Sequence, residues 1–351
     1  MKPEVNKLKL AFYIISSTLM ITFVFYGYQI CFTSNVLVDR EDRAFIIHQS
    51  DTYQTILKNL GENDFVGEMV SFSFLAKLTG YDKAIVPGRY ILRRNMTNLQ
   101  ALKVLRFGKQ EVVKVTFSVA RLRKDLVEKI TKNVGMSPDE FNDALDEFIS
   151  SNKEGFNKEN ILCMFLPNTY EVYFNVMPED LIKRMNSEYK KFWNEERIAK
   201  AKEVGLTPIE VSILASIVQA ESIKQDEAPI IAGLYINRLK KNIALQADPT
   251  LVYAVGDFTL KRVLNGHKEI DSPYNTYKHP GLIPGPINVP QIASIDAVLN
   301  YQHHNYYYMC AKEDFSGYHN FANSLDEHSR NARKYQRALD AEMAKAKQNK
   351  K

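Results

Sequence analysis

The sequence is poor in the features that mark several common classes of protein. Its three cysteines, Cys31, Cys163 and Cys310, are odd in number and far apart, which excludes a disulfide framework. There is no glycine-rich phosphate loop and no Cys/His spacing typical of zinc, so we expect neither a cofactor nor a metal site. The net charge is only +5 and the basic residues are dispersed, so we expect no nucleic-acid partner.

A long uncharged segment near the N-terminus is the strongest signal in the chain. No charged residue occurs from Leu10 to Val38, and the apolar run reaches Phe32. This run exceeds the roughly 20 residues that cross a bilayer as a helix. We therefore expect one transmembrane helix over residues 10–32. A cleaved signal peptide is disfavoured because the run is long and no small-x-small cleavage site follows it.

The charges that flank this run predict its orientation. Lys2, Lys7 and Lys9 precede it, and positive charge is retained on the cytoplasmic side. We therefore expect residues 1–9 in the cytoplasm and everything from about residue 36 outside it, with the chain held in the cell (inner) membrane.

Residues 44–115 have the pattern of a small α+β module that resembles LysM-like wall-binding modules. We expect strands at 44–49, 86–97 and 110–117 and helices at 51–62, 66–80 and 98–108. The alternative is an ordinary small domain that positions the next one.

The rest of the chain is mixed in character. Residues 116–205 are mostly helical and charged, with helices expected at 121–135, 137–151 and 178–205 and a strand within 165–174. Residues 206–335 hold the densest motifs, and 336–351 form a charged tail. The fold class is therefore α+β, in which a transmembrane helix is followed by a small module and a larger mixed domain.

One predicted helix carries an acidic residue on the face that should pack into the protein core. Thr207 suits the N-cap, Pro208 suits the first helical position, and Glu210 completes a capping box. An apolar face follows with i, i+3, i+4 spacing, from Leu214 onward. The i+7 position on that face is Glu221.

The face is made by Leu214, Ile217 and Val218, and Glu221 extends it. A carboxyl group on an apolar face has its charged form disfavoured, which raises its pKa. Such a group can hold a proton near neutral pH and act as a general acid.

A second helix repeats this pattern. Ile230, Leu234 and Asn237 fall at i, i+4 and i+7, so a polar side chain again takes an apolar position. Gln246 and Asp248 follow, just before a proline turn.

The segment 271–290 combines five prolines with aromatic and amide side chains, including Tyr274, Asn275, Tyr277 and Asn288. Aromatic faces stack on sugar rings, and short polar side chains bond to hydroxyl groups, so this composition suits a carbohydrate ligand. We expect these side chains at the surface of a functional loop. The alternative is a rigid loop without a ligand.

Four ordered blocks identify a resemblance. They read "ASIVQAES", "AGLYINRLKKNIALQADPTLVYAVG", "SPYNTYKHPGLIPGPINVP" and "HNFANSLDEH". They are similar to successive blocks of the endolytic murein transglycosylase family, also called YceG-like. The sequence departs from the family pattern at Gln219, Asn168 and Ile283, and it lacks the usual Pro-Glu-Gly after the strand near residue 117.

The resemblance implies a single-pass inner-membrane lyase. Such an enzyme cuts the MurNAc-β-1,4-GlcNAc bond inside nascent peptidoglycan strands, leaves 1,6-anhydroMurNAc ends and terminates strand elongation. It implies the glycan strands and the cell membrane as partners, with peptidoglycan synthases and the elongation machinery as further ones. Residues 206–335 would be the catalytic core and 116–205 the connecting part of the catalytic region.

The resemblance places the catalytic acid on Glu221. The candidate substrate-binding residues are Ser222, Asn237, Arg238, Gln246, Asp248, Thr250, Ser272, Tyr274, Asn275, Thr276, Tyr277, Gly285, Asn288, His319, Phe321 and His328. Two alternatives stay open at this point. The chain could be a peptidoglycan hydrolase that uses Asp248 as the second carboxylate, or a non-catalytic membrane-tethered scaffold that binds the wall.

Overall fold

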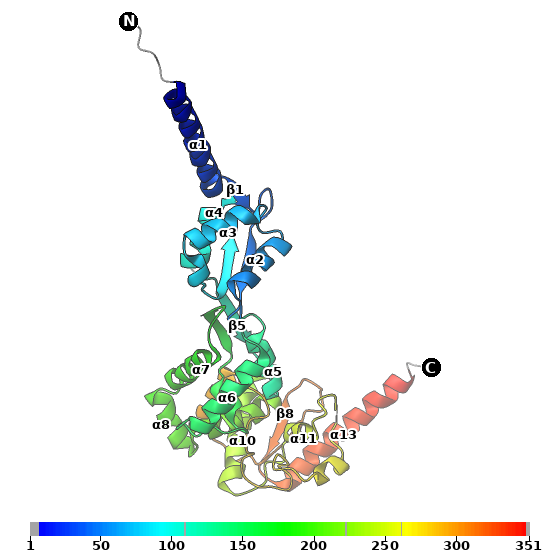
Figure 1. Ribbon diagram of the computed structural model, residues 1–351. Coiled ribbons are helices and arrows are strands. Elements are labelled where there is room, and N and C mark those ends of the chain that lie inside the picture. Colours follow the sequence, from blue (N-terminus) through cyan, green and yellow to red (C-terminus); the bar gives the residue numbers. More distant parts are fainter. Residues whose placement is uncertain (1–6, 109, 222, 261, 349–351) are drawn as a thin grey trace. The chain divides into compact units, whose positions relative to one another are not determined.

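The computed structural model describes residues 7–108, 110–221, 223–260 and 262–348. The fold is mixed α+β, as expected, and the chain divides into two compact units (Figure 1). The N-terminal unit comprises the described residues up to Lys114 together with 133–136 and 171–176. The C-terminal unit comprises 115–132, 137–170 and the described residues from Met177 onward.

Helix α1, Lys7–Phe32, occupies the predicted membrane-spanning segment. None of its residues is buried within the chain, and it is long and apolar enough to cross a membrane. A helix that is apolar all round and uncovered by protein needs an apolar environment to cover it. The sequence prediction of an apolar N-terminal helix is therefore confirmed.

The N-terminal unit contains the predicted order of strand, two helices and strand. Its elements are β1 Ser34–Val36, β2 Arg43–Ile47, α2 Tyr53–Glu62, α3 Met69–Leu78, a 3-10 turn at Tyr81–Lys83, β3 Gly88–Leu92, β4 Met96–Thr97 and α4 Asn98–Phe107, and β5 Val112–Phe117 follows. Strands β2 and β3 pair antiparallel from Arg43–Leu92 to Ile47–Gly88, and β1 pairs with β4.

Local capping explains where the two central helices of this unit begin. Thr52 caps α2 and forms a capping box with Thr55. Helix α3 begins at Met69, three residues later than the sequence predicts, because the Glu68 carboxylate accepts the N–H groups of Val70 and Ser71. The helices pack on the β2–β3 ribbon around buried residues that include Phe45, Ile56, Phe72, Tyr90 and Leu105.

The C-terminal unit is mostly helical. Its elements are α5 Arg123–Thr131, α6 Pro138–Ser151, β6 Asn168–Tyr173, α7 Pro178–Phe192, α8 Glu195–Val204, α9 Pro208–Glu221, α10 Ala228–Lys240, α11 Asp248–Val255, α12 Ile292–Leu299, β7 Tyr308–Ala311, β8 His319–Ala322 and α13 Leu325–Gln348, with 3-10 turns at Ile161–Met164, Gln225–Glu227 and Asn265–Glu269. Strand β5 pairs with β6, and β7 pairs antiparallel with β8.

The second half of this unit differs from the sequence predictions at one helix and at the tail. The helix expected over 178–205 is two helices, because the Asn194 side chain accepts the Arg197 N–H at 3.0 Å and caps a new helix there. Helix α13 begins at Leu325 and packs against β7 and β8, and the described part of the charged tail continues this helix to Gln348.

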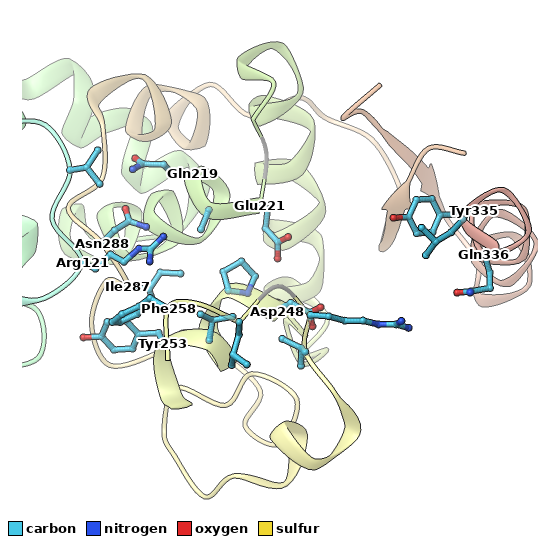
Figure 2. A pocket seen from close by; sticks show the side chains of 18 of the residues that line it. Arg121, Gln219, Glu221, Asp248, Tyr253, Phe258, Ile287, Asn288, Tyr335 and Gln336 are labelled. Carbon is cyan, nitrogen blue, oxygen red and sulfur yellow. The ribbon is translucent and has the colours of Figure 1, made fainter. Parts of the chain in front are cut away.

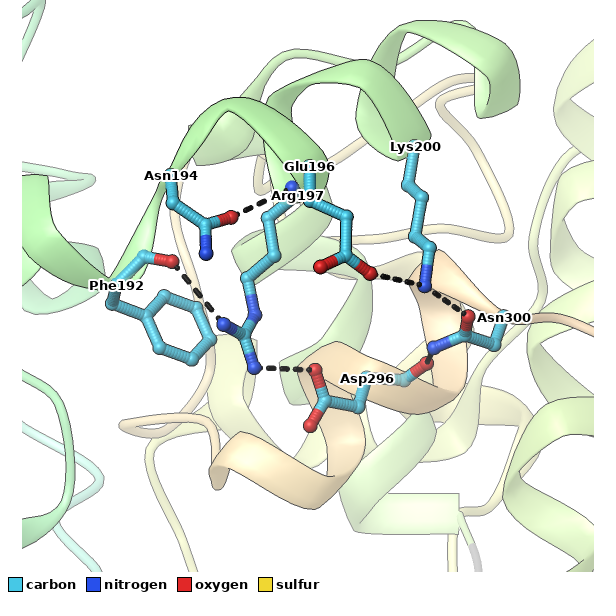
Figure 3. Close-up of polar contacts among 7 residues, drawn as sticks. All are labelled: Phe192, Asn194, Glu196, Arg197, Lys200, Asp296 and Asn300. Carbon is cyan, nitrogen blue, oxygen red and sulfur yellow. Dashed lines mark hydrogen bonds and ion pairs between the residues drawn. The ribbon is translucent and has the colours of Figure 1, made fainter.

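Helix α9 is the centre of this unit and packs against α8, α10, α11 and α12. A polar cluster fastens two of these neighbours to each other (Figure 3). Arg197 on α8 pairs with Asp296 on α12 at 3.3 Å, and Lys200 donates to the Asn300 side chain at 3.0 Å. The cluster therefore helps to fix the helices that surround α9.

Candidate active site

The start of α9 is built as its sequence predicts. The Thr207 N–H donates to the Glu210 carboxylate at 2.7 Å, and the Glu210 N–H donates to the Thr207 hydroxyl at 3.3 Å. Both bonds of the capping box are present, with Pro208 at the first helical position. This register decides which side chains face the core and which appear at the last turn.

The apolar face of α9 ends at Glu221. Leu214, Ile217 and Val218 are fully buried, and Glu221 is half-buried in the last turn. Glu221 and Asp248 both line a cavity of about 940 Å³ and a second of about 360 Å³. The acid that the sequence places on a core face therefore lies where two cavities meet.

Figure 2 shows the larger cavity with Glu221 and Asp248 exposed to the same space. The side chains of Arg121, Tyr253 and Phe258 line it, and α13 contributes Tyr335 to the wall. Sequence reasoning did not select these residues. Tyr253 could have been found as an aromatic residue on the helix that starts at Asp248, whereas the role of Tyr335 depends on where α13 packs.

A tyrosine on α10 holds Glu221. The buried Tyr235 hydroxyl donates to Glu221 Oε1 at 2.7 Å. Burial raises the pKa of Glu221 to about 7, and the charge of Asp248 adds to the rise. The Tyr235 hydrogen bond and the charge of Arg238 lower the pKa and so oppose it. Both the protonated and the ionised form of Glu221 are therefore populated near neutral pH, so the residue can donate a proton and accept one.

Asp248 is placed differently, although it also meets a tyrosine. It is the exposed first residue of α11, and Tyr277 donates its hydroxyl to Asp248 Oδ1 at 2.6 Å. Burial and the Asp248 carboxylate both raise the pKa of Tyr277, so the tyrosine keeps the proton that it donates. The two carboxylates thus enter the same cavities from two different helices.

Arg238 fixes the chain that leads to Asp248. Its guanidinium is buried and donates to the backbone carbonyls of Tyr307 at 2.6 Å and of Ala244 and Leu245 at 2.9 Å. It also donates to the Gln246 side chain at 3.3 Å. Arg238 is therefore both a structural clamp and a positive charge near Glu221.

Two buried threonines join the proline-rich segment to the start of α11. Thr250 and Thr276 share a hydrogen bond of 2.8 Å, and the Ala247 N–H donates to the Thr276 hydroxyl at 3.0 Å. The Gln246 N–H donates to the Thr276 carbonyl at 3.0 Å. These bonds hold Tyr277 beside Asp248.

Asn275 does not lie at the surface, which corrects the sequence expectation for this loop. It is fully buried, and its amide donates to the carbonyls of Lys268 and Ile270 at 2.9 and 2.8 Å. Its oxygen accepts the Tyr277 N–H at 3.0 Å. A segment so rich in proline has few backbone donors, and the Asn275 side chain supplies the bonds that shape the turn.

Three more residues of this segment also bond or pack within the protein. The Ser272 hydroxyl accepts the Tyr274 N–H at 3.2 Å, and the half-buried Tyr274 ring lies 4.7 Å from the Tyr253 ring. A Cβ at Gly285 would lie 1.9 Å from the Glu159 carbonyl oxygen, so only glycine fits there.

Asn288 lines the larger cavity and is tied to α9. Its amide donates to the Ser216 carbonyl at 3.0 Å, and the neighbouring Ile287 N–H donates to the Ser216 hydroxyl at 3.1 Å. The Gln219 side chain accepts the Gln291 N–H at 2.6 Å, so the end of the proline-rich segment follows the last turns of α9.

Two histidines near the C-terminus of the core, His319 and His328, lie at the smaller cavity. His319 contacts the buried Glu227 carboxylate at 2.9 Å, and the His328 ring stacks on Tyr308 at 5.4 Å. Burial and the Arg238 charge lower the pKa of His328, which favours its neutral form. Both histidines line the cavity that Glu221 also reaches.

The predicted site residues therefore divide into two groups. Those that line a cavity with Glu221 are Arg238, Gln246, Asp248, Tyr277, Asn288, His319 and His328. Those that line neither cavity are Asn237, Thr250, Ser272, Tyr274, Asn275, Thr276, Gly285 and Phe321. Ser222 lies outside the described residues.

Two members of the second group support the strand β7 region. Asn237 donates its amide to the carbonyls of His304 and Tyr306 at 2.8 and 3.1 Å, and Phe321 stacks on Tyr306 at 5.6 Å. The polar residue that interrupts the α10 pattern thus holds the chain that leads into β7. In the part of the chain that the structure describes, no cluster of three His, Cys, Asp or Glu residues could hold a metal ion.

Comparison with known proteins identifies the family. Residues 45–334, more than half of the chain, match the YceG-like family. The chain belongs to the YceG-like family. A crystal structure of a YceG-like protein from Listeria monocytogenes has the same fold, with a TM-score of 0.54, 24% identity and coverage of 83% of this chain and 98% of that one.

Curated relatives in the family are named endolytic murein transglycosylases. One from Streptococcus pneumoniae (strain D39 / NCTC 7466) is 26% identical over 343 residues, which is 88% of this chain and 61% of the relative. One from Bacillus subtilis (strain 168) is 36% identical over 157 residues, covering 45% of this chain and 42% of the relative. The chain therefore spans less than two thirds of the length of these relatives.

Proposed function

We propose that this chain is a membrane-anchored lytic transglycosylase. It cleaves the MurNAc-β-1,4-GlcNAc bond inside nascent peptidoglycan strands, leaves 1,6-anhydroMurNAc ends and so terminates strand elongation. The observation that carries the proposal is Glu221, a half-buried acid with its pKa raised to about 7 where two cavities meet. The names of the relatives support the same substrate class.

The reaction begins with the protonated acid. Tyr235 donates to Oε1 of Glu221, which leaves Oε2 to carry the proton toward the glycosidic oxygen. Glu221 gives this proton to the leaving oxygen of GlcNAc as the bond from that oxygen to the anomeric carbon of MurNAc breaks. The sugar becomes positively charged and the glutamate becomes a carboxylate.

The same residue completes the reaction. The Glu221 carboxylate takes the proton from the C6 hydroxyl of MurNAc, and the C6 oxygen bonds to the anomeric carbon. The glutamate recovers its proton and no water enters the product. Tyr235 and Arg238 stabilise the transient carboxylate, because a hydrogen-bond donor and a nearby positive charge both favour the ionised form.

The surroundings of Glu221 suit a bond inside a strand rather than at its end. Because Glu221 lines two cavities, sugars on both sides of the cleaved bond have room to bind. The rings of Tyr253, Phe258 and Tyr335 offer flat faces for sugar rings in the larger cavity.

A second candidate is a glycoside hydrolase of the same substrate. Asp248 favours it, because this carboxylate lines both cavities together with Glu221. A hydrolase would use Asp248 as nucleophile or base and would release reducing ends. Mass spectrometry of the sugars released from purified glycan strands separates the two, since only the transglycosylase forms anhydro ends.

The Glu221→Gln variant tests catalysis as such. If neither the parent chain nor the variant released sugars, a scaffold that binds the wall without cutting it would replace both enzymatic functions. If sugars with anhydro ends disappear while the folded variant still binds strands, the transglycosylase assignment stands.

The anchor and the small module belong to the same proposal. Helix α1 would cross the cell membrane with the N-terminus in the cytoplasm, and a C-terminal reporter active only in the cytoplasm should then stay silent. The order β2, α2, α3, β3 supports a LysM-like module. The test is to substitute residues of this module alone and to measure the binding of labelled glycan strands, which should weaken if the module binds them.

A further inference from the structure

Helix α3 of the N-terminal unit is apolar on two opposite faces. Phe72 and Leu75 on one face are buried in the unit. On the other, Val70, Phe74 and Leu78 recur at every fourth residue and are 78%, 57% and 71% exposed. An exposed apolar face of this kind needs cover, and the described part of the chain covers only the face of Phe72 and Leu75. Val70, Phe74 and Leu78 are called the α3 face below.

Hydrogen bonds tie α3 to the end of the membrane-spanning helix. The buried Asn98 amide donates to the Ile30 carbonyl of α1 at 3.0 Å and to the Ser71 hydroxyl of α3 at 3.1 Å. Ile30 also packs against the core of the unit. Figure 1 shows α3 and α4 directly beside the end of α1. The first turn of α3, which carries Val70, is therefore fixed next to Ile30.

The length of α1 sets the depth of this junction in a bilayer. The apolar run Leu10–Phe32 is about 34 Å long at about 1.5 Å per residue. The hydrocarbon core of a bilayer is about 30 Å thick, so Ile30 falls at its edge, where the headgroups begin. The start of α3 must lie at the same level because Asn98 joins the two helices.

We infer that the α3 face lies against the outer headgroup region of the bilayer that α1 crosses. This inference rests on the proposed membrane anchor and adds a second, peripheral contact to it. Exposed Lys77 on α3 and Lys103 on α4 suit anionic headgroups, and Phe107 is 74% exposed at the end of α4, where Arg106 bonds to the Thr79 carbonyl. An interfacial helix of this kind combines an apolar face with flanking lysines.

The consequence is a restricted orientation of the N-terminal unit at the membrane. A single helix leaves the attached unit free to tilt, whereas a helix plus an apolar face contacts the bilayer at two places.

The test uses tryptophan as a probe of depth. Phe74→Trp and, as the matched control, Val112→Trp are made in the full chain and placed in phosphatidylethanolamine–phosphatidylglycerol vesicles. Val112 is 48% exposed and begins β5, which Figure 1 shows at the opposite end of the N-terminal unit from α1. The only natural tryptophan, Trp193, is buried, so the parent chain supplies the background emission.

Lipids with brominated acyl chains should quench most of the emission that Phe74→Trp adds, and dissolved iodide should quench little of it. Val112→Trp should show the reverse. A tryptophan at position 74 that iodide quenches as strongly as the control overturns the inference. Protection from both quenchers, with a dependence on the protein-to-lipid ratio, overturns it in favour of a second copy of the chain as the cover.

Flotation of the vesicles separates this result from failure of the anchor. A chain that does not float with the vesicles overturns both the anchor and the α3 contact. A chain that floats but shows no lipid quenching at position 74 overturns the α3 contact alone. None of these readouts depends on the activity at Glu221.

Discussion

The end of α9 and the start of α11 present two carboxylates to the same cavities under opposite conditions. Glu221 and Asp248 each accept one tyrosine hydroxyl, at 2.7 and 2.6 Å. Glu221 is half-buried at the C-terminal end of its helix, where the helix dipole disfavours negative charge, and Asp248 is exposed at the N-terminal end of its helix, where the dipole favours it. A shared hydrogen-bonding partner therefore does not make the two acids equivalent.

The difference in burial and in helix position suggests different roles for Glu221 and Asp248. Burial gives Glu221 a pKa of about 7, so it suits proton transfer in both directions. Asp248 acts on Glu221 through its charge, which raises the pKa of Glu221, and through the Tyr277 bond that shapes the cavity wall. The predictions below test whether the two acids differ as much in function as in surroundings.

The largest effect is expected for Glu221→Gln. Glutamine keeps the size of the side chain and cannot transfer a proton, so formation of anhydro ends should fall by at least about 10²–10⁴-fold. The measurement is mass spectrometry of products from purified glycan strands, with circular dichroism as the control for folding. Near-normal turnover would move the catalytic assignment to Asp248.

The same substitution should change the stability of the protein with pH. The folded chain holds the Glu221 proton more tightly than an unfolded chain does, because the pKa is about 7 instead of 4.5. The stability from this carboxyl is complete at low pH and is lost as the pH rises through 7. Glu221→Gln should therefore be more stable than the parent chain by about 1–3 kcal/mol at about pH 8, and no more stable at about pH 4.

Thermal or urea unfolding at several pH values measures this difference. The matched control is Asp248→Asn, which removes only one of the contributions to the raised pKa of Glu221 and should therefore give a smaller gain of the same sign. Equal stability of Glu221→Gln and the parent chain at both extremes of pH would contradict a desolvated Glu221.

A smaller effect is expected for Asp248→Asn. If Asp248 acts only through its charge and its bond to Tyr277, its loss should lower turnover by about tenfold, which corresponds to about 1.4 kcal/mol. Initial rates of anhydro-end formation measure the change. A loss as large as that of Glu221→Gln, together with reducing ends in the products of the parent chain, would favour the hydrolase.

The smallest change in rate is expected for Tyr235→Phe, but it should shift the pH profile. The lost bond normally lowers the pKa of Glu221, so the pH at which activity declines on the alkaline side should rise. The groups that act on Glu221 are Tyr235 and Arg238 from α10 and Asp248 from α11, with Tyr277 close by. We expect turnover within about tenfold of the parent chain, since a typical hydrogen bond contributes about 0.5–1.5 kcal/mol.

Tyr277→Phe is the matched control for that shift. It removes the hydroxyl that Asp248 accepts and leaves the Tyr235 bond to Glu221 in place. The alkaline limb of its pH–activity profile should stay closer to that of the parent chain. If both variants moved the limb equally, the tyrosines would act on one shared network rather than on separate acids.

The sequence predicted elements best where short-range chemistry decides them. The capping box at Thr207 and Glu210 fixed the register of α9, and the 3.6-residue period then placed Glu221 on the face of Leu214 and Val218. The apolar run of α1 needed only its composition. The helix expected over 178–205 failed because Asn194 caps a new helix, a signal that a charged helical pattern conceals.

The sequence was a poor guide to which polar residues face a cavity and which bond within the protein. Tyr274 and Asn275 look alike as members of a proline-rich loop, yet Asn275 is buried with all its bonds inside the turn. Composition predicts that such a segment is rigid, whereas the direction of each side chain depends on the turn geometry and on neighbours such as Tyr253.

By itself, the sequence determined the start of α9, the apolar N-terminal helix and the position of one acid on an apolar face, because caps, hydropathy and periodicity act between residues close in the chain. Only the tertiary structure decided that Tyr235 would meet Glu221, that Asp248 would share its cavities and that α13 would supply Tyr335 to their wall. The pKa of Glu221 follows from burial and charges contributed by other helices, and such long-range packing leaves no mark in the local pattern of α9.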